Sequence, residues 1–186
     1  MDVFHFLEGA IPDGRGRTLS MIMAFDDQAI ESTHDFIQWI FPLDEPSRSH
    51  PGAPVLDLFE IEEIKSSEVA QANLMQSADW YFGFLQRHDH WIRQYDHNHL
   101  RITRVIKSLR LLVSDEVADQ FKSAILDFLR GNISVIGERS REYWLDAQLN
   151  LYDTSFTSKN VIVILRQTIT LMNDNDRFGQ DYGPAL

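Results

Sequence analysis

Cysteine is absent from this chain of 186 residues, so neither a disulfide bond nor a thiolate site can form within it. That composition is typical of a reducing compartment. Basic residues are few, since 17 lysines and arginines stand against 28 aspartates and glutamates, for a formal net charge of −11. This acidic balance disfavours nucleic acid as the main partner, because phosphate contacts need positive charge.

Long apolar runs are missing as well. No segment approaches the roughly 20 consecutive apolar residues that cross a bilayer. The start, MDVFHFLEG, has neither the basic flank nor the apolar run of a signal peptide. A hydrophobic content of 44% is nevertheless sufficient for a substantial core. We therefore expect a cytoplasmic protein with one domain and no transmembrane segment.

Helix-starting residues are what the sequence has in abundance. Side chains that typically cap helix N-termini precede apolar residues at helical spacing in several places. They are Thr18, Asp26 or Asp27, Ser67 and Ser114. The periodicity predicts helices at 18–25, 26–39, 58–64, from 67, and at 97–113, 114–131, 138–149 and 158–172. The run VIVIL alone has strand character, and no second strand is evident to pair with it.

The predicted fold class is therefore all-α. We expect a single compact, irregular bundle of six to eight helices over residues 1–172, followed by a polar, disordered tail at residues 173–186. The sequence gives no indication of the oligomeric state.

His34 lies within the second predicted helix. Ile30, Ile37 and Phe41 recur there at helical spacing and predict an apolar stripe that includes His34. Gln38 follows one turn later on the flank of the stripe. The imidazole must meet a polar partner, and the sequence leaves open whether this is protein or ligand. A histidine satisfied within the core is the commoner case.

A second stripe lies along the segment HNHLRITRVIKSLRLL. His97, Arg101, Arg104 and Ser108 follow the border of its apolar face at positions i, i+4, i+7 and i+11. Guanidinium groups offer fixed forks of donors that suit carboxylate or phosphate, so the stripe predicts an anion site. The structural alternative is ion pairing with acidic neighbours, which is the commoner role of such arginines. Spacing does not decide between the two.

The run HDFIQWIFPLDEP, followed by IKSSEVAQANL, YFGF and HNHLRITRVIKSLRLL, resembles the conserved region of the opioid growth factor receptor family. The resemblance spans roughly Phe6 to Tyr143. It implies an all-helical domain. In the vertebrate members it implies a receptor for an enkephalin peptide, and that receptor is associated with the nucleus and its envelope. The family motifs fall on both stripes, at His34, Gln38, Trp39, Phe41, Pro42, His97, Leu100, Arg101, Thr103, Arg104, Ser108 and Leu109.

Together these patterns predict a ligand-binding domain with the site residues His34, Gln38, His97, Arg101 and Arg104. The arginines would bind an anionic small molecule or peptide, and the other three would orient it. Because border positions tolerate neutral polar residues, replacing both arginines with glutamine is expected to preserve the helical spectrum.

Three alternatives stay open. The domain could be an enzyme of unknown reaction, with His34 or His97 as general acid or base. It could be a haem or metal protein, or a protein-interaction domain whose motif residues only hold the core together. We favour binding over catalysis and expect no cofactor.

The metal alternative rests on two His-x-His pairs, His88 with His90 and His97 with His99. Imidazole is a common ligand of transition metals and of haem. Residues at i and i+2 of a helix point about 200° apart, so neither pair forms a chelate there. We expect solvated loop histidines and no metal.

Overall fold

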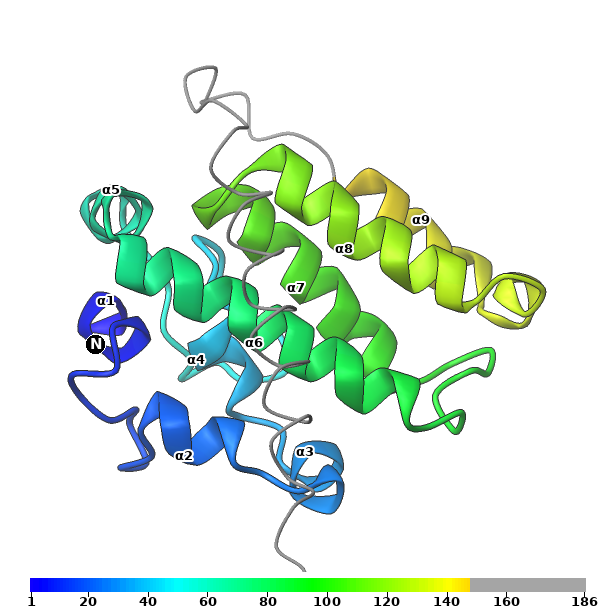
Figure 1. Cartoon of the computed structure of the whole chain (residues 1–186), viewed down its shortest axis with the longest axis horizontal. Coiled ribbons are helices and arrows are strands. Elements are labelled where there is room, and N and C mark those ends of the chain that lie inside the picture. The colour runs from blue at the N-terminus through cyan, green and yellow to red at the C-terminus, as the bar shows by residue number, and fades with distance from the viewer. Residues whose placement is uncertain (148–186) are drawn as a thin grey trace, which may run out of the picture. The chain divides into compact units, whose positions relative to one another are not determined.

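The structure, a computed structural model, describes residues 1–147. Within this range it consists of α-helices and one 3-10 turn, and its sole β-type pairing is an isolated bridge between Leu43 and Val55 (Figure 1). The all-α prediction is therefore confirmed for these residues. None of the helices in this part of the chain is long and apolar enough to cross a membrane.

Nine α-helices make up residues 1–147, five of them longer than two turns. They are α1 (Val3–Leu7), α2 (Leu19–Met23), α3 (Asp27–Ser32), α4 (Ile37–Ile40), α5 (Leu58–Ser66), α6 (Glu68–Gln86), α7 (His97–Leu112), α8 (Asp115–Phe128) and α9 (Glu138–Asp146), with the 3-10 turn η1 (Ile133–Val135) before α9. The predicted helix at 158–172 and the predicted tail at 173–186 lie outside the described residues.

The predicted N-caps are present. The side-chain oxygens of Thr18, Asp26, Ser67 and Ser114 each accept a hydrogen bond from the backbone N–H three residues later, at 2.7–3.2 Å. Each bond satisfies one of the N–H groups that the first turn of a helix leaves without an intrahelical partner. Local side-chain chemistry therefore fixes where α2, α3, α6 and α8 begin.

The central helix of the described unit is α7, which packs against α5, α6, α8 and α9 (Figure 1). The apolar face predicted for it is buried at Ile102, Val105, Ile106, Leu109 and Leu112, whereas Val113, also predicted for this face, is half-buried at the end of the helix. Removal of this face from water is the main favourable contribution to packing. At the amino-terminal side, α1 packs on α4, α5 and α6.

The single helix predicted for residues 26–39 is wrong. The structure divides it into α3 and α4, with Thr33 extended and residues 33–36 outside either helix. A continuous helix would turn Phe36 about 120° away from the stripe of Ile30 and Ile37. The break allows Phe36 to be fully buried, edge-on to Phe25 and to Trp80.

Two consequences follow from this break. His34 does not lie inside an apolar stripe, because its side chain falls in the interhelical segment and is exposed. The number of helices also exceeds the predicted six to eight, since one helix becomes two and the sequence pattern did not predict α1.

Candidate functional site

Arg101 reaches from α7 to the carboxyl-terminal end of α3. Its Nη1 donates to the carbonyl of Ile30 at 3.0 Å, and its Nη2 donates to the carbonyl of Thr33 at 2.7 Å. Carbonyls at the end of a helix have no intrahelical partner and carry the negative end of the helix dipole. The guanidinium donates hydrogen bonds to these carbonyls and places a positive charge at this negative end of the helix. We call this arrangement of Arg101, Ile30 and Thr33 the α3 clamp.

The α3 clamp is supported by a polar network in the core. Nη1 of Arg101 also donates to Oδ1 of Asn98 at 3.2 Å, and the Tyr81 hydroxyl donates to the same oxygen at 2.9 Å. Nδ2 of Asn98 donates to Glu31 at 3.1 Å. The guanidinium lies over the ring of Phe36, 5.5 Å from its centroid. Burial raises the pKa of Tyr81, so this phenol stays a neutral donor.

Arg101 is therefore not a border residue, as the helical wheel predicted, because it is only 5% exposed. Ser108, which the wheel also placed on the border, is fully buried. The apolar face of α7 is wider than the wheel indicated, since helices pack on both sides of it. Of that predicted border, His97 and Arg104 alone are half-buried.

His34 is held by Arg101. Nη2 of Arg101 lies 3.1 Å from Nδ1 of His34. Arginine has donors and no acceptor, so Nδ1 of His34 is the acceptor in this contact. The partner that meets this imidazole is thus protein, although the ring itself lies at the surface.

His97 completes the group that the structure brings together. Its ring packs edge-on to that of His34, with 5.3 Å between centroids, and its Nε2 lies 3.5 Å from a carboxylate oxygen of Glu31. Burial lowers the pKa of His97, and the positive charge of Arg101 adds to the effect. Three of the five predicted site residues, His34, His97 and Arg101, therefore share one cluster.

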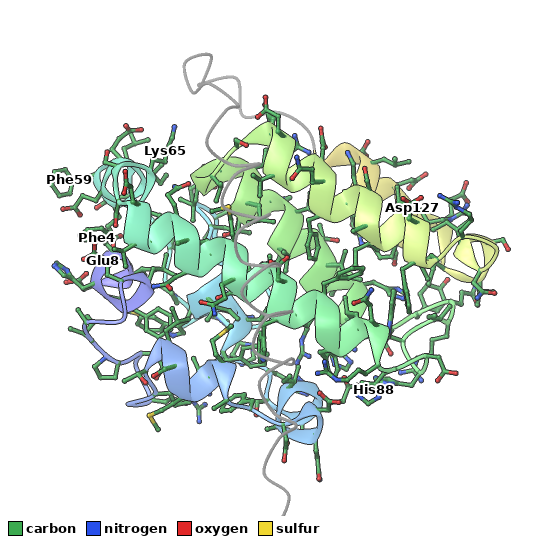
Figure 2. The ribbon with its side chains drawn as sticks, viewed as in Figure 1. Phe4, Glu8, Phe59, Lys65, His88 and Asp127 are labelled. Atoms are coloured by element: carbon green, nitrogen blue, oxygen red, sulfur yellow. The ribbon has the colours of Figure 1, made fainter. Side chains whose placement is uncertain are left out.

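The loop histidines do more than face solvent. Nε2 of His88 lies 2.8 Å from Asp27, and Nε2 of His90 lies 3.1 Å from Glu31. Figure 2 shows His88 close to α3. A hydrogen bond from Arg87, followed by that from His88, lowers the pKa of Asp27 to about 2. We call the contacts of Asp27 and Glu31 with His88, His90 and His97 the histidine seam.

The histidine seam ties α3 to the segment between α6 and α7 and to the first residue of α7. Burial opposes ionisation of Glu31, but the hydrogen bond from Asn98 and the charge of His97 outweigh it and lower its pKa.

Within residues 1–147, no three histidine, aspartate or glutamate side chains are placed to hold a metal ion.

Arg104 is in a different state from Arg101. Its Nη1 donates to the carbonyl of Phe41 at 3.0 Å, and no carboxylate of the described residues lies within ion-pair distance of it. Burial lowers the pKa of Arg104, and the charge of Glu45 opposes that shift. Its remaining donors form no hydrogen bond with the described chain and are not sealed from solvent.

Gln38 is separate from the cluster. It is almost fully buried, and no hydrogen bond joins it to Arg101 or His97 among the described residues. Its Oε1, like Oγ of Ser108, is enclosed without a hydrogen-bond partner in this part of the chain. The sequence correctly indicated that Gln38 is a polar side chain at a buried face. Within the described residues, however, no hydrogen bond joins Gln38 to His34.

A cavity of about 240 Å³ lies beside the outer face of α7. It is lined by Leu43, Asp44, Glu45, Lys107, Arg110, Leu111, Asp146 and Ala147. Lys107 and Leu111 follow Arg104 by one and two turns, so the cavity continues the same side of the helix. None of the five predicted site residues lines it.

Two residues of the clamp network were missed in the sequence, Glu31 and Asn98. Asn98 had a detectable signal, because it precedes Ile102 by one turn and so falls on the apolar face of α7. A polar side chain on such a face needs a buried partner. Glu31 carried no comparable signal, since its position at the end of α3 depends on the break at Thr33.

Residues 17–91 match the model of one protein family, described as the opioid growth factor receptor (OGFr) conserved region. This part of the chain is similar to the OGFr conserved region. The resemblance predicted from the motifs is thereby confirmed. No solved structure matches the chain significantly.

Distant homology to OGFr proteins extends beyond that match. The rat opioid growth factor receptor is 34% identical over 98 residues, which cover 43% of this chain and 17% of the rat protein. The human receptor is also 34% identical over 98 residues, covering 14% of its length. The mouse opioid growth factor receptor-like protein 1 is 29% identical over 126 residues, covering 56% of this chain and 25% of the relative. The chain thus spans about a sixth of the rat and human receptors it matches.

The OGFr match divides the clamp between two parts of the chain. The acceptors of the α3 clamp, Ile30 and Thr33, lie inside residues 17–91, as do His34 and Gln38. Arg101 and Arg104 lie after the matched residues. The end of α3, inside the matched residues, is therefore bonded to a side chain that follows them.

Proposed function

We propose that this OGFr-type domain binds an anionic group of a small molecule or peptide at Arg104. The observation that carries the proposal is the state of this guanidinium, half-buried with a single carbonyl acceptor and no carboxylate partner among residues 1–147. A partly desolvated charge without a counter-charge is costly, and an anion would relieve that cost. Guanidinium groups suit carboxylates and phosphates in particular.

Arg101 has a structural role in this proposal. An anion at Arg101 would have to displace the carbonyls of Ile30 and Thr33, which would lose their partners at about 1–3 kcal/mol each. His34 and His97 act through the clamp, since one accepts from Arg101 and the other packs on that ring. Of the predicted five, Arg104 is thus the direct ligand contact.

The surroundings of Arg104 support a peptide or a similar small molecule. The cavity that follows it along α7 has apolar walls at Leu43 and Leu111, next to charged groups. Pockets that combine apolar walls with a few charged groups are typical of binding sites. The matched relatives are named receptors, which agrees with a binding role.

The test compares short peptides that have a free C-terminal carboxylate with their C-terminal amides, and with inorganic phosphate. Calorimetric titration should detect the acid forms, and Arg104→Gln should weaken their binding at least tenfold. Arg130→Gln is the matched control, because it removes the same charge at an exposed position where Arg130 pairs with Asp127. Equal affinity for acid and amide, or unchanged binding by Arg104→Gln, would refute the proposal.

A second candidate is a protein-interaction domain whose motif residues hold the fold together. The α3 clamp favours it, because Arg101, His34 and His97 are all committed to contacts within the chain. In that case Arg101→Gln should impair partner binding only to the extent that it unfolds the domain. Thermal unfolding measured alongside binding separates the two candidates.

A further inference from the structure

The first turn of α5 exposes two large apolar side chains. Leu58 is 83% exposed and Phe59 is 70% exposed, and Val55 shortly before them is 43% exposed. Figure 2 shows Phe59 projecting from the edge of the described unit. Adjacent apolar side chains in water mark interaction sites more often than scattered single ones do. Their burial in an interface would remove apolar surface from water, which favours association.

The fold itself does not require these two side chains. The buried face of α5 is formed by Ile61 and Ile64. Leu58 precedes Ile61 by one turn and continues that stripe past the edge of the core, where it meets solvent. Phe59 lies on the outer face of α5, on the same side as Glu62 and Glu63. We call Leu58, Phe59, Glu62 and Glu63 the α5 surface.

The surroundings of the α5 surface are acidic. α1 packs on α5, where the backbone N–H of Val3 donates to Glu60 at 3.2 Å. α1 thereby adds Asp2 and Glu8 to the acidic groups of α5, and Figure 2 shows Glu8 and Phe4 on the same edge as Phe59. The basic groups here are already engaged, since His5 pairs with Asp2 and Lys65 lies 3.9 Å from Glu62.

We propose that the α5 surface docks a basic amphipathic helix of a partner protein. Such a helix would place apolar residues against Leu58 and Phe59, with lysines or arginines on its flanks facing Glu62 and Glu63. Charge complementarity selects this occupant. A second copy of the chain would bring the same acidic groups against each other, and an anionic membrane would be repelled by them. This surface is independent of Arg104.

The probe is a synthetic leucine–lysine peptide with leucines at i, i+3, i+4 and i+7. Its binding to the full chain is measured by fluorescence anisotropy. Replacing the apolar pair, Leu58→Ser with Phe59→Ser, should weaken binding at least tenfold without changing the thermal unfolding temperature, because both side chains are exposed. The matched control, Met21→Ser with Leu145→Ser, changes two residues that are each 55% exposed on other helices, and it should bind like the wild type.

Charge is tested separately. Glu62→Gln with Glu63→Gln should weaken binding and reduce its salt dependence. The same change at Glu116 and Glu142, on α8 and α9, removes equal charge elsewhere and should have a smaller effect. Arg104→Gln should leave peptide binding intact, which distinguishes this inference from the proposed function.

Three results would overturn the inference. The first is unchanged binding by the Leu58 and Phe59 variant. The second is a dimer in sedimentation that this variant dissociates, which would identify a second copy as the occupant. The third is binding of the chain to phosphatidylserine vesicles that depends on Leu58 and Phe59, which would identify a membrane.

Discussion

Arg101 and Arg104 are the same residue type, three positions apart on one helix, yet their surroundings give them opposite roles. Arg101 donates to carbonyls at the end of α3, whereas Arg104 donates to the carbonyl of Phe41 and to no other group of residues 1–147. Carbonyls at the end of a helix have no intrahelical partner and are strong acceptors for a buried guanidinium. Phe41 at the end of α4 offers such a carbonyl too, so the difference between the two arginines comes from the number of acceptors that each one meets.

This difference predicts unequal stability effects. Arg101→Gln should lower the free energy of unfolding by about 2–4 kcal/mol, because several buried acceptors lose a charged donor. Arg104→Gln should lower it by about 1 kcal/mol or less, since a single described carbonyl, that of Phe41, loses its donor. Urea denaturation of both variants measures the difference. Equal effects would show that the α3 clamp contributes little.

His99 has a fixed tautomer that can be observed directly. Its Nε2 donates to the carbonyl of Trp91 at 2.9 Å, and its Nδ1 accepts from the Ser140 hydroxyl at 3.1 Å. Burial lowers the pKa of His99, whereas the hydrogen bond to Asp2 raises the pKa of the exposed His5. Nitrogen-15 NMR should find His99 neutral with its proton on Nε2 at pH 7, and titrating below His5. The reverse order would contradict the structure.

At the level of elements, the sequence predicted those helix starts that depend on a neighbouring side chain. Each capping side chain accepts from a backbone N–H three residues later, so local spacing was sufficient to predict these starts. The capping residues are Thr18, Asp26, Ser67 and Ser114. The break before α4 could not be predicted in this way. It depends on Phe36 reaching Trp80, a contact between residues that are distant in the sequence.

Gly137, the residue that precedes α9, lies against the chain before α7. Its N–H donates to the carbonyl of Gln94 at 3.1 Å, and a Cβ at this position would lie 2.5 Å from that oxygen. Gly137→Ala should lower the free energy of unfolding by about 1–3 kcal/mol, because backbone must move to admit the methyl group. Chemical denaturation measures this. Gly52→Ala, which meets open space, is the control and should have little effect.

At the level of the whole domain, buried histidines couple stability to pH. The pKa values of His97 and His99 are lowered by burial, so the folded state binds fewer protons than the unfolded chain below the ordinary histidine value of about 6.5. The free energy of unfolding should therefore fall as the pH is lowered from 7 to 5. Urea denaturation across this range measures it, and a rise would contradict the assignment.

Carboxylates act in a separate range of pH. The pKa of Asp27 is about 2 in the folded domain, held there by Arg87 and His88. Its contribution to stability is present above its ordinary value of 3.8 and is lost as the pH falls from there toward 2. Asp27→Asn should flatten the stability profile below pH 4 and leave the change between pH 7 and 5 in place, because His97 and His99 cause that change.

The sequence identified three side chains of the candidate site more successfully than their hydrogen-bond partners. His34, His97 and Arg101 were predicted to lie together, and they do. Their roles could not be predicted, because the acceptors for Arg101 are backbone carbonyls, which residue identity does not reveal. The exposure of Leu58 was equally hidden, since its spacing from Ile61 is that of a core residue.

The α3 clamp also sets an order of events during protein synthesis. Arg101 follows Ile30 by 71 residues and Thr33 by 68, so α3 emerges from the ribosome long before its cap has been translated. Contacts between such distant residues form late. Ribosome-bound chains that stop before Arg101 should leave α3 open to proteases, and chains that expose all of α7 should protect it. The end of α3 therefore waits for a residue that is made more than halfway through the chain.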